Sequence, residues 1–196
     1  MPDRLQLFVS AGPDLESERD TVGQVVAKLP LSLGWNVKRT PPKGEPLAVT
    51  LENIRKAHFF IMILGVDITA PVGAEWDAAR RVGLPILAYL KEVTRTPAAM
   101  IFVRDSRILW TPFRTHEELA RRVEADLARG LLDRATELGL TIADWENLNA
   151  LLKRLEAAKP TSAEEGAREP AGAEGGGVIL APGRDLPSGG IFIEPN

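Results

Sequence analysis

The side chain in this sequence that is best placed for chemistry is the carboxyl group of Glu75. It lies in the segment Gly65–Trp76, after the apolar run His58–Leu64, where the pattern predicts the first turn of a helix that follows a strand. The dipole and free amide groups of a first turn favour an ionised carboxylate. Above a strand end, such a group can stabilise a developing oxocarbenium ion or attack an anomeric carbon. A plainer interpretation is that Glu75 only stabilises its own helix N-terminus.

Two loops contain most of the other residues that would contact a ligand. Gly12 and Gly65 let the backbone come close to a phosphate or ribose, although neither loop has the GxGxxG or GxxxxGK[ST] pattern. Asp14 is also a good helix N-cap. Arg39 ends the predicted second strand, beside a proline-rich loop, where it could contact a phosphate. The candidate ligand-binding residues are Ser10, Gly12, Asp14, Arg39, Gly65 and Asp67.

Other ionisable residues are assigned no chemistry. Glu18 and Arg19 are interpreted as an ordinary exposed pair on the first helix. His58 begins a strand that is expected to be buried, and His116 lies at a predicted helix N-terminus.

The composition narrows the classes of protein to consider. A net charge of −3 over 196 residues argues against a nucleic-acid-binding surface, which usually needs a basic excess. The absence of cysteine excludes disulfides and thiolate ligands, and two histidines disfavour a metal centre. No apolar run reaches the roughly 18–20 residues of a membrane helix, and the N-terminus lacks the pattern of a secretory signal. We therefore expect a cytoplasmic protein without a nucleic acid or membrane partner, a metal or a cofactor.

Strand and helix patterns alternate along residues 5–159. Compact apolar runs predict strands at Leu5–Ser10, Trp35–Arg39, His58–Leu64 and Pro85–Leu90, with a fifth at Met100–Val103 or Ile108–Trp110. Alternating strands and helices imply right-handed βαβ units and a parallel sheet. The expected fold is α/β, a flavodoxin-like three-layer sandwich with five strands in the order 2-1-3-4-5. Ligands of such sheets bind at the carboxyl ends of the first and third strands, which places the site at Ser10–Asp14 and Gly65–Glu75.

The predicted helices and strands share one apolar core. The third helix is expected to begin near Gly73, and a last helix, Thr141 to about Ala158, is expected to turn Trp145 inward. The residues expected to be buried together are Phe8, Val26, Ile54, Phe60, Ile61, Leu64, Ile86, Leu87, Leu119 and Val123.

Three regions follow from the changes in composition along the chain. Residues 1–130 form the α/β domain, and residues 131–159 a helical extension. Residues 160–196 form a tail that holds 8 of the 17 glycines and 5 of the 15 prolines. Residues 160–177 bury too little apolar surface to offset their ordering entropy, so no regular structure is expected there. Two short β-branched runs in 178–195 are compatible with a short hairpin or a docking strand.

Two motifs resemble a known family. The first comprises Phe8-Val9-Ser10, Asp14-Leu15 and Glu18-Arg19, and the second Glu75-Trp76, Ala79 and Gly83-Leu84-Pro85. Together, over residues 4–128, they resemble a TIR-like domain of unknown function that occurs at the N-termini of STAND-type NTPases. The resemblance implies the flavodoxin-like plan of TIR domains and nucleoside deoxyribosyltransferases, with a catalytic glutamate at Glu75. Ala11-Gly12-Pro13 departs from the family and, like Gly73-x-Glu75, is similar to the deoxyribosyltransferases.

Three functions remain open on this basis. The first is a TIR-like signalling or effector domain that binds a nucleotide such as NAD, with or without cleaving its N-glycosidic bond at Glu75. The second is a non-catalytic protein-interaction module, which would assemble as a homo-oligomer. The third is a nucleoside deoxyribosyltransferase or hydrolase, with Glu75 as nucleophile and Asp67 assisting. The two motifs favour the first and second functions without separating them.

Overall fold

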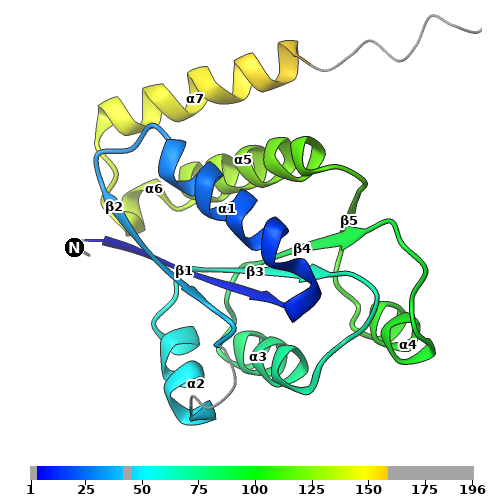
Figure 1. Cartoon of the computed structure of the whole chain (residues 1–196). Helices are drawn as coiled ribbons and strands as arrows, with labels where there is room; N and C mark the ends of the chain where they lie inside the picture. The colour runs from blue at the N-terminus through cyan, green and yellow to red at the C-terminus, as the bar shows by residue number, and fades with distance from the viewer. Residues whose placement is uncertain (1–3, 42–45, 159–196) are drawn as a thin grey trace, which may run out of the picture. The chain divides into compact units, whose positions relative to one another are not determined.

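Five strands form one parallel sheet, and helices cover both of its faces (Figure 1). The computed structural model describes residues 4–41 and 46–158. The strands are β1 (Arg4–Ala11), β2 (Gly34–Arg39), β3 (Phe59–Leu64), β4 (Ile86–Lys91) and β5 (Trp110–Phe113). The helices are the short 3-10 helix η1 (Pro13–Leu15), α1 (Glu16–Lys28), α2 (Leu47–Arg55), α3 (Ala70–Arg81), α4 (Pro97–Asp105), α5 (His116–Asp133), α6 (Ala135–Leu138) and α7 (Ile142–Ala157).

The strand order confirms the expected flavodoxin-like α/β fold. It reads β2-β1-β3-β4-β5, and each neighbouring pair is parallel. All six residues of β3 are buried, as its unalternating apolar sequence predicts for a strand that is covered on both faces. At the centre of the sheet, Ile61 pairs with Val9 on one side and with Leu87 on the other.

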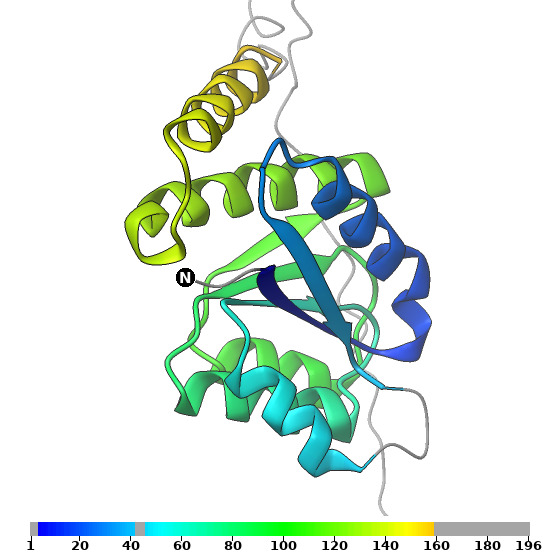
Figure 2. The same cartoon turned by 90° about the vertical axis from the view of Figure 1, so that its left-hand side faces the viewer.

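The helices form a layer on each face of the sheet. Helices α1 and α5 cover one face, and α2, α3 and α4 cover the other (Figures 1 and 2). Helix α7 packs on the outer side of α5, on the same side as α1 (Figure 1). This arrangement leaves the carboxyl ends of the strands at one edge, between the two helical layers.

The sheet separates two apolar cores, because successive side chains of a strand point to opposite faces. One core joins Val9 and Ile61 to Val26 of α1 and Val123 of α5. The other joins Phe60 and Phe8, whose rings stack at 5.7 Å, to α2 and α3. The prediction that these residues are all buried together is therefore wrong, because the sheet divides them between two cores. In addition, Ile86 and Leu87 are only partly buried.

Two predicted elements differ from the structure. Met100–Val103 belongs to helix α4 rather than to a strand. The helix begins at Pro97 and is capped by Thr96, whose hydroxyl accepts a hydrogen bond from the Ala99 amide at 3.2 Å. The fifth strand is β5, which begins at Trp110. Helix α3 begins at Ala70, three residues before the expected Gly73, because Pro71 suits the first turn of a helix.

The predicted boundary between residues 130 and 131 falls within α5, which ends at Asp133. The described residues on both sides of this boundary belong to one compact unit. In α7, Leu148 and Leu151 are buried whereas Trp145 is half exposed, so the inward orientation expected for Trp145 is wrong. Trp145 lies three positions before the buried Leu148, which places it at the edge of the narrow buried stripe of α7. The predictions for 160–177 and 178–195 lie outside the described residues.

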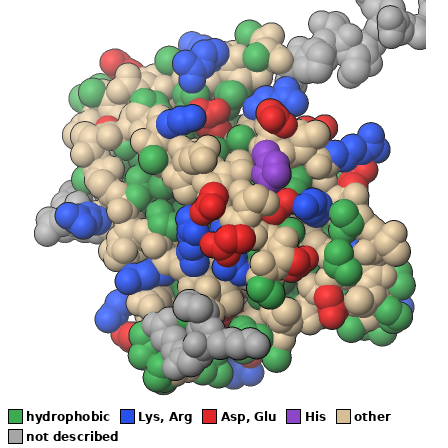
Figure 3. Space-filling model, in the orientation of Figure 1, with side chains coloured by type: hydrophobic (Ala, Val, Ile, Leu, Met, Phe, Trp, Pro, Cys, Tyr) green, Lys and Arg blue, Asp and Glu red, His purple; other side chains and the backbone are tan. Residues whose placement is uncertain are grey.

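The face of the molecule seen in Figure 3 presents charges of both signs next to one another. Ion pairs between the described residues include Arg39–Asp20 at 3.0 Å and Arg129–Asp126 at 3.1 Å. Within residues 4–41 and 46–158, no helix combines the length and apolar character that crossing a membrane requires.

Candidate functional site

The parallel strands bring three loops together at their carboxyl ends. Strand β1 lies between β2 and β3, and the chain leaves β1 toward α1 on one face and β3 toward α3 on the other (Figure 1). Loops that diverge in this way open a crevice in which doubly wound proteins bind ligands.

Glu75 lies at this edge and is completely buried, with none of its surface exposed. Its Oε2 atom accepts a hydrogen bond from Ser10 Oγ at 2.5 Å and another from Thr40 Oγ1 at 2.8 Å. Glu75 is the sixth residue of α3, so the expected place in the first turn is wrong. The side chain makes no cap contact with its own helix and instead joins α3 to the ends of β1 and β2.

The second carboxyl oxygen of Glu75 has a different environment. Oε1 is buried and has no hydrogen-bond partner among the described residues. Burial raises the pKa of Glu75, and the hydrogen bonds from Ser10 and Thr40 and the positive charge of Arg19 offset this in part. Unpaired buried oxygens are costly, and carboxyls with a shifted pKa in a crevice are typical of functional sites. Oε1 is thus an acceptor that a ligand hydroxyl could satisfy.

Thr40 is a member of the site that the sequence analysis does not assign. Its hydroxyl donates to Glu75 and accepts from the Ala11 amide at 3.2 Å. Thr40 follows β2 directly, and β2 pairs with β1. The rule that selects Ser10, a hydroxyl at the carboxyl end of a strand beside the switch point, would have selected Thr40 as well.

Arg19 is the second such member. Its Nη2 atom donates to the carbonyl oxygens of Ala11 at 2.6 Å and Gly12 at 2.7 Å, and its side chain is nearly buried. Glu18 is buried too and binds Lys91 at 2.6 Å, so interpreting these two residues as an exposed pair is wrong. The helical spacing carries the signal, because residue 19 lies four positions after the buried Leu15 and hence on the inner face of α1.

Gly12, Asp14 and Gly65 come together as expected, but with Asp14 filling the space between the two loops. A Cβ atom on Gly12 would lie 2.5 Å from Asp14 Oδ1, and one on Gly65 would lie 3.0 Å from Asp14 Oδ2. Asp14 is not an N-cap, because Pro13 starts η1 one residue earlier and Gly12 takes the cap position. The exposed Asp14 carboxylate therefore lies against both glycines, at the side of the crevice.

The remaining two candidates lie outside the hydrogen-bond network of Glu75. Asp67 is exposed and accepts hydrogen bonds from the Ile68 amide and the Thr96 hydroxyl, which ties the loop after β3 to the start of α4. Arg39 lies against α1, where it pairs with Asp20 at 3.0 Å and with Glu16 at 3.4 Å. Neither side chain approaches Glu75 through a recorded contact.

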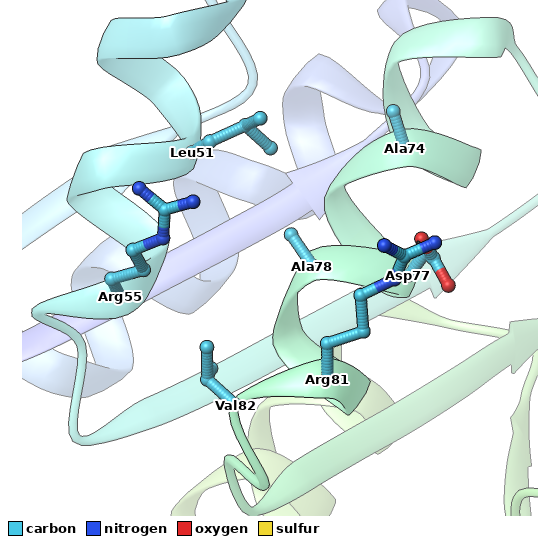
Figure 4. A pocket seen from close by; sticks show the side chains of 7 residues that line it. All are labelled: Leu51, Arg55, Ala74, Asp77, Ala78, Arg81 and Val82. Atoms are coloured by element: carbon cyan, nitrogen blue, oxygen red, sulfur yellow. Dashed lines mark ion pairs between the residues drawn. The ribbon is translucent and has the colours of Figure 1, made fainter.

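A pocket of about 230 Å³ lies elsewhere, between α2 and α3 (Figure 4). Leu51 of α2 and the small side chains Ala74 and Ala78 of α3 line it, and Arg55 stands at its rim. The carboxylate there, Asp77, already pairs with Arg81 at 2.7 Å. The pocket thus lacks the unpaired polar group that distinguishes Glu75. Within residues 4–41 and 46–158, no group of three acidic or histidine side chains has a spacing suited to a metal ion.

Comparison with known proteins adds little to this description. No family model matches the sequence, and no curated protein matches it. Among solved structures, the chain is similar to the metal-soaked Flv1 flavodiiron core from Synechocystis sp. PCC6803, with a TM-score of 0.41 and 11% sequence identity over 78% of the chain. The chain spans 37% of the length of that protein chain. A likeness at this level carries no argument about function, and the fold assignment rests on the strand order described above.

Proposed function

We propose that this chain binds the ribosyl group of a nucleotide such as NAD at the carboxyl ends of β1 and β3, and that Glu75 assists cleavage of the N-glycosidic bond there. One observation carries the proposal: Glu75 is a buried carboxyl with two hydroxyl donors on one oxygen and no partner on the other. Cleavage of a nucleotide is also the activity that the resemblance to TIR-like signalling domains implies.

The chemistry follows from where charge develops. When the bond between C1′ and the base nitrogen breaks, its electron pair leaves with the base, and positive charge develops on C1′ and the ring oxygen. Water then adds to C1′ and releases a proton. An ionised carboxylate held beside C1′ stabilises this charge in a site of low dielectric constant. Ser10 and Thr40 hold Oε2 in place, so Oε1 is the oxygen available to the ribose.

The site is closed in the structure described. Because no surface of Glu75 is exposed, a substrate reaches the carboxyl only after the groups that cover it move aside. The proposed reaction therefore includes an opening step before the chemical step. The raised pKa of Glu75 adds a pH dependence: activity falls as the pH decreases through this pKa, since the carboxylate becomes protonated.

The same burial favours a second candidate, the non-catalytic interaction module. In that case Glu75 is a structural bridge that joins α3 to β1 and β2 through Ser10 and Thr40. A structural bridge predicts a stable fold without any nucleotide turnover, which makes the two candidates separable in one experiment.

That experiment compares the wild type with Glu75→Gln and Asp77→Asn. Each protein is incubated with NAD and with purine and pyrimidine deoxynucleosides, and base release is followed by chromatography. The loss of a charge-stabilising group commonly costs about 100- to 1000-fold in rate, which is the loss expected for Glu75→Gln. Asp77→Asn is the matched control, since it removes a carboxylate of the same helix that pairs with Arg80 and Arg81 on the surface, and it should retain wild-type activity.

The substrate panel also distinguishes the candidates. Release from deoxynucleosides alone would favour the deoxyribosyltransferase or hydrolase over an NAD-cleaving enzyme. No base release from any substrate by a folded wild type would overturn the catalytic proposal and favour the interaction module.

A further inference from the structure

The buried guanidinium of Arg19 is the starting point of this inference. Two of its hydrogen bonds go to the carbonyl oxygens of Ala11 and Gly12, at the end of β1. A second nitrogen, Nη1, binds the exposed Glu16 at 2.7 Å, and the third, Nε, is buried without a hydrogen-bond partner among the described residues. A surface ion pair with Glu16 requires no burial of the arginine, so the burial of Arg19 calls for a different explanation.

Arg19 is connected to Glu75 through consecutive hydrogen bonds. Ala11 accepts from Arg19 with its carbonyl oxygen and donates to Thr40 with its amide. Thr40 in turn donates to Glu75 Oε2. The connection joins α1, β1, β2 and α3, so the turn after β1 is held from one side by Arg19 and from the other by Thr40. Moving Arg19 moves the hydroxyl that orients the carboxyl.

Arg19 is also the charged side chain that acts on Glu75. It lowers the pKa of Glu75, whereas the groups that contact the carboxyl from β1 and β2, Ser10 and Thr40, are neutral hydroxyls. The ionic side chains of α2 and α3 are paired on the protein surface within their own helices: Glu52 with Arg55 and Lys56, and Asp77 with Arg80 and Arg81.

We propose that Arg19 is a positioning residue for Glu75: it fixes the turn after β1, and it brings a buried positive charge to the edge of the sheet at which the Glu75 carboxyl lies. Arg19 touches neither substrate nor reacting atoms in this scheme and acts through Ala11 and Thr40. The inference rests on the proposed function for its role in turnover, but its effect on the ionisation of Glu75 needs no substrate.

The test is a ¹³C NMR titration of the Glu75 side-chain carboxyl in the full chain. The signal is assigned by its absence from Glu75→Gln. In Arg19→Gln, the loss of the positive charge should move the titration midpoint to higher pH. Arg19→Lys retains the positive charge but not the paired hydrogen bonds to the carbonyl oxygens of Ala11 and Gly12. Its titration midpoint for Glu75 should lie between those of the wild type and Arg19→Gln.

A second variant tests the same idea without disturbing the buried arginine. Glu16→Gln removes the anion that partly neutralises Arg19, so the midpoint of Glu75 should move to lower pH. Glu16 is 59% exposed, and its replacement should leave the fold intact. Asp20→Asn is the matched control, because Asp20 lies on the same helix, is 58% exposed and pairs with Arg39 instead. The titration midpoint of Glu75 in Asp20→Asn should equal that in the wild type.

An unchanged midpoint in a folded Arg19→Gln variant would overturn the inference. If Arg19→Gln does not fold, Glu16→Gln decides alone: a lower midpoint supports the inference, and an unchanged or higher one overturns it. These readings are independent of base release. A wild type that cleaves no nucleotide but shows the predicted midpoints would refute the proposed function and leave the effect of Arg19 on Glu75 in place.

Discussion

Replacing Asp144 with alanine is expected to reduce the free energy of unfolding by about 2 kcal/mol at pH 7. Asp144 is a nearly buried acid at the start of α7. Its two carboxyl oxygens accept four hydrogen bonds, from the amide and hydroxyl of Ser32 and from the amide and hydroxyl of Thr141. Asp144 thus completes the capping box of α7, whose N-cap is Thr141, and also fastens the helix to the turn after α1.

Two routes lead to this magnitude. Loss of an N-terminal cap typically costs about 0.5–2 kcal/mol. Independently, the hydrogen bonds from Thr141 and Ser32 outweigh burial and lower the pKa of Asp144 from 3.8 to about 2. At about 1.36 kcal/mol for each pH unit, this corresponds to about 2.4 kcal/mol in favour of the ionised side chain in the folded protein.

The assay is urea unfolding of the wild type and of Asp144→Ala, followed by circular dichroism at pH 7, 5, 4 and 3. A depressed pKa contributes stability that is complete above the unfolded value of 3.8 and disappears as the pH falls toward about 2. The difference between the two proteins should therefore be constant from pH 7 to 5 and shrink at pH 4 and 3. Glu146→Ala, at an exposed position of the same helix, is the control and should change stability by less than about 0.5 kcal/mol. A difference below about 0.5 kcal/mol at pH 7 for Asp144→Ala, or one of equal size at pH 7 and 3, would refute the reasoning.

Three further predictions concern the site and the core that the sheet forms with α1 and α5. The folded-state pKa of Glu75 is raised by burial, so its contribution to stability is present at low pH and is lost as the pH rises through that pKa. In urea unfolding, the stability of Glu75→Gln relative to the wild type should therefore increase toward pH 8, and the opposite trend would contradict this. Ile61→Ala, in the central strand and fully buried, should cost about 2–5 kcal/mol, whereas Leu109→Ala at a 91% exposed position should cost less than about 0.5 kcal/mol. Gly130→Ala would place a Cβ atom 2.8 Å from the buried Phe59 ring, and thermal unfolding should show a loss of about 1–3 kcal/mol from overpacking, even though alanine is the better helix former; a gain in stability would mean that the ring moves aside freely.

The strand order was predictable because burial on both faces leaves a direct trace in the sequence. His58–Leu64 lacks alternation, and only a central strand tolerates an uninterrupted apolar run. The position of Glu75 at the carboxyl edge, and its neighbour Ser10, follow from the same topology. Helix α3 starts earlier than the expected Gly73, because Pro71 is a good residue for the first turn.

The contacts of the site could not be predicted to the same extent. A run of residues shows on which face of an element a side chain lies, but not its partner on another element. Arg39 illustrates this, because its position at the end of β2 suits a phosphate contact as well as it suits the observed ion pairs with α1. Whether the carboxylate of Asp14 would point outward or between Gly12 and Gly65 depends on the course of two loops, which no local pattern specifies.

The hydrogen bond between the Ala11 amide and Thr40 gives the site a built-in kinetic probe. Ala11 is fully buried, and its amide proton is held by the same hydroxyl that contacts Glu75. An opening that withdraws Thr40 exposes this proton to solvent deuterium. Under conditions in which exchange is faster than reclosing, such as high pH, the exchange rate at this one backbone position measures how often the crevice opens. If Thr40 must withdraw before a substrate can enter, turnover cannot be faster than that opening. The exchange rate of a single amide would then set a ceiling on kcat, measurable before any substrate has been found.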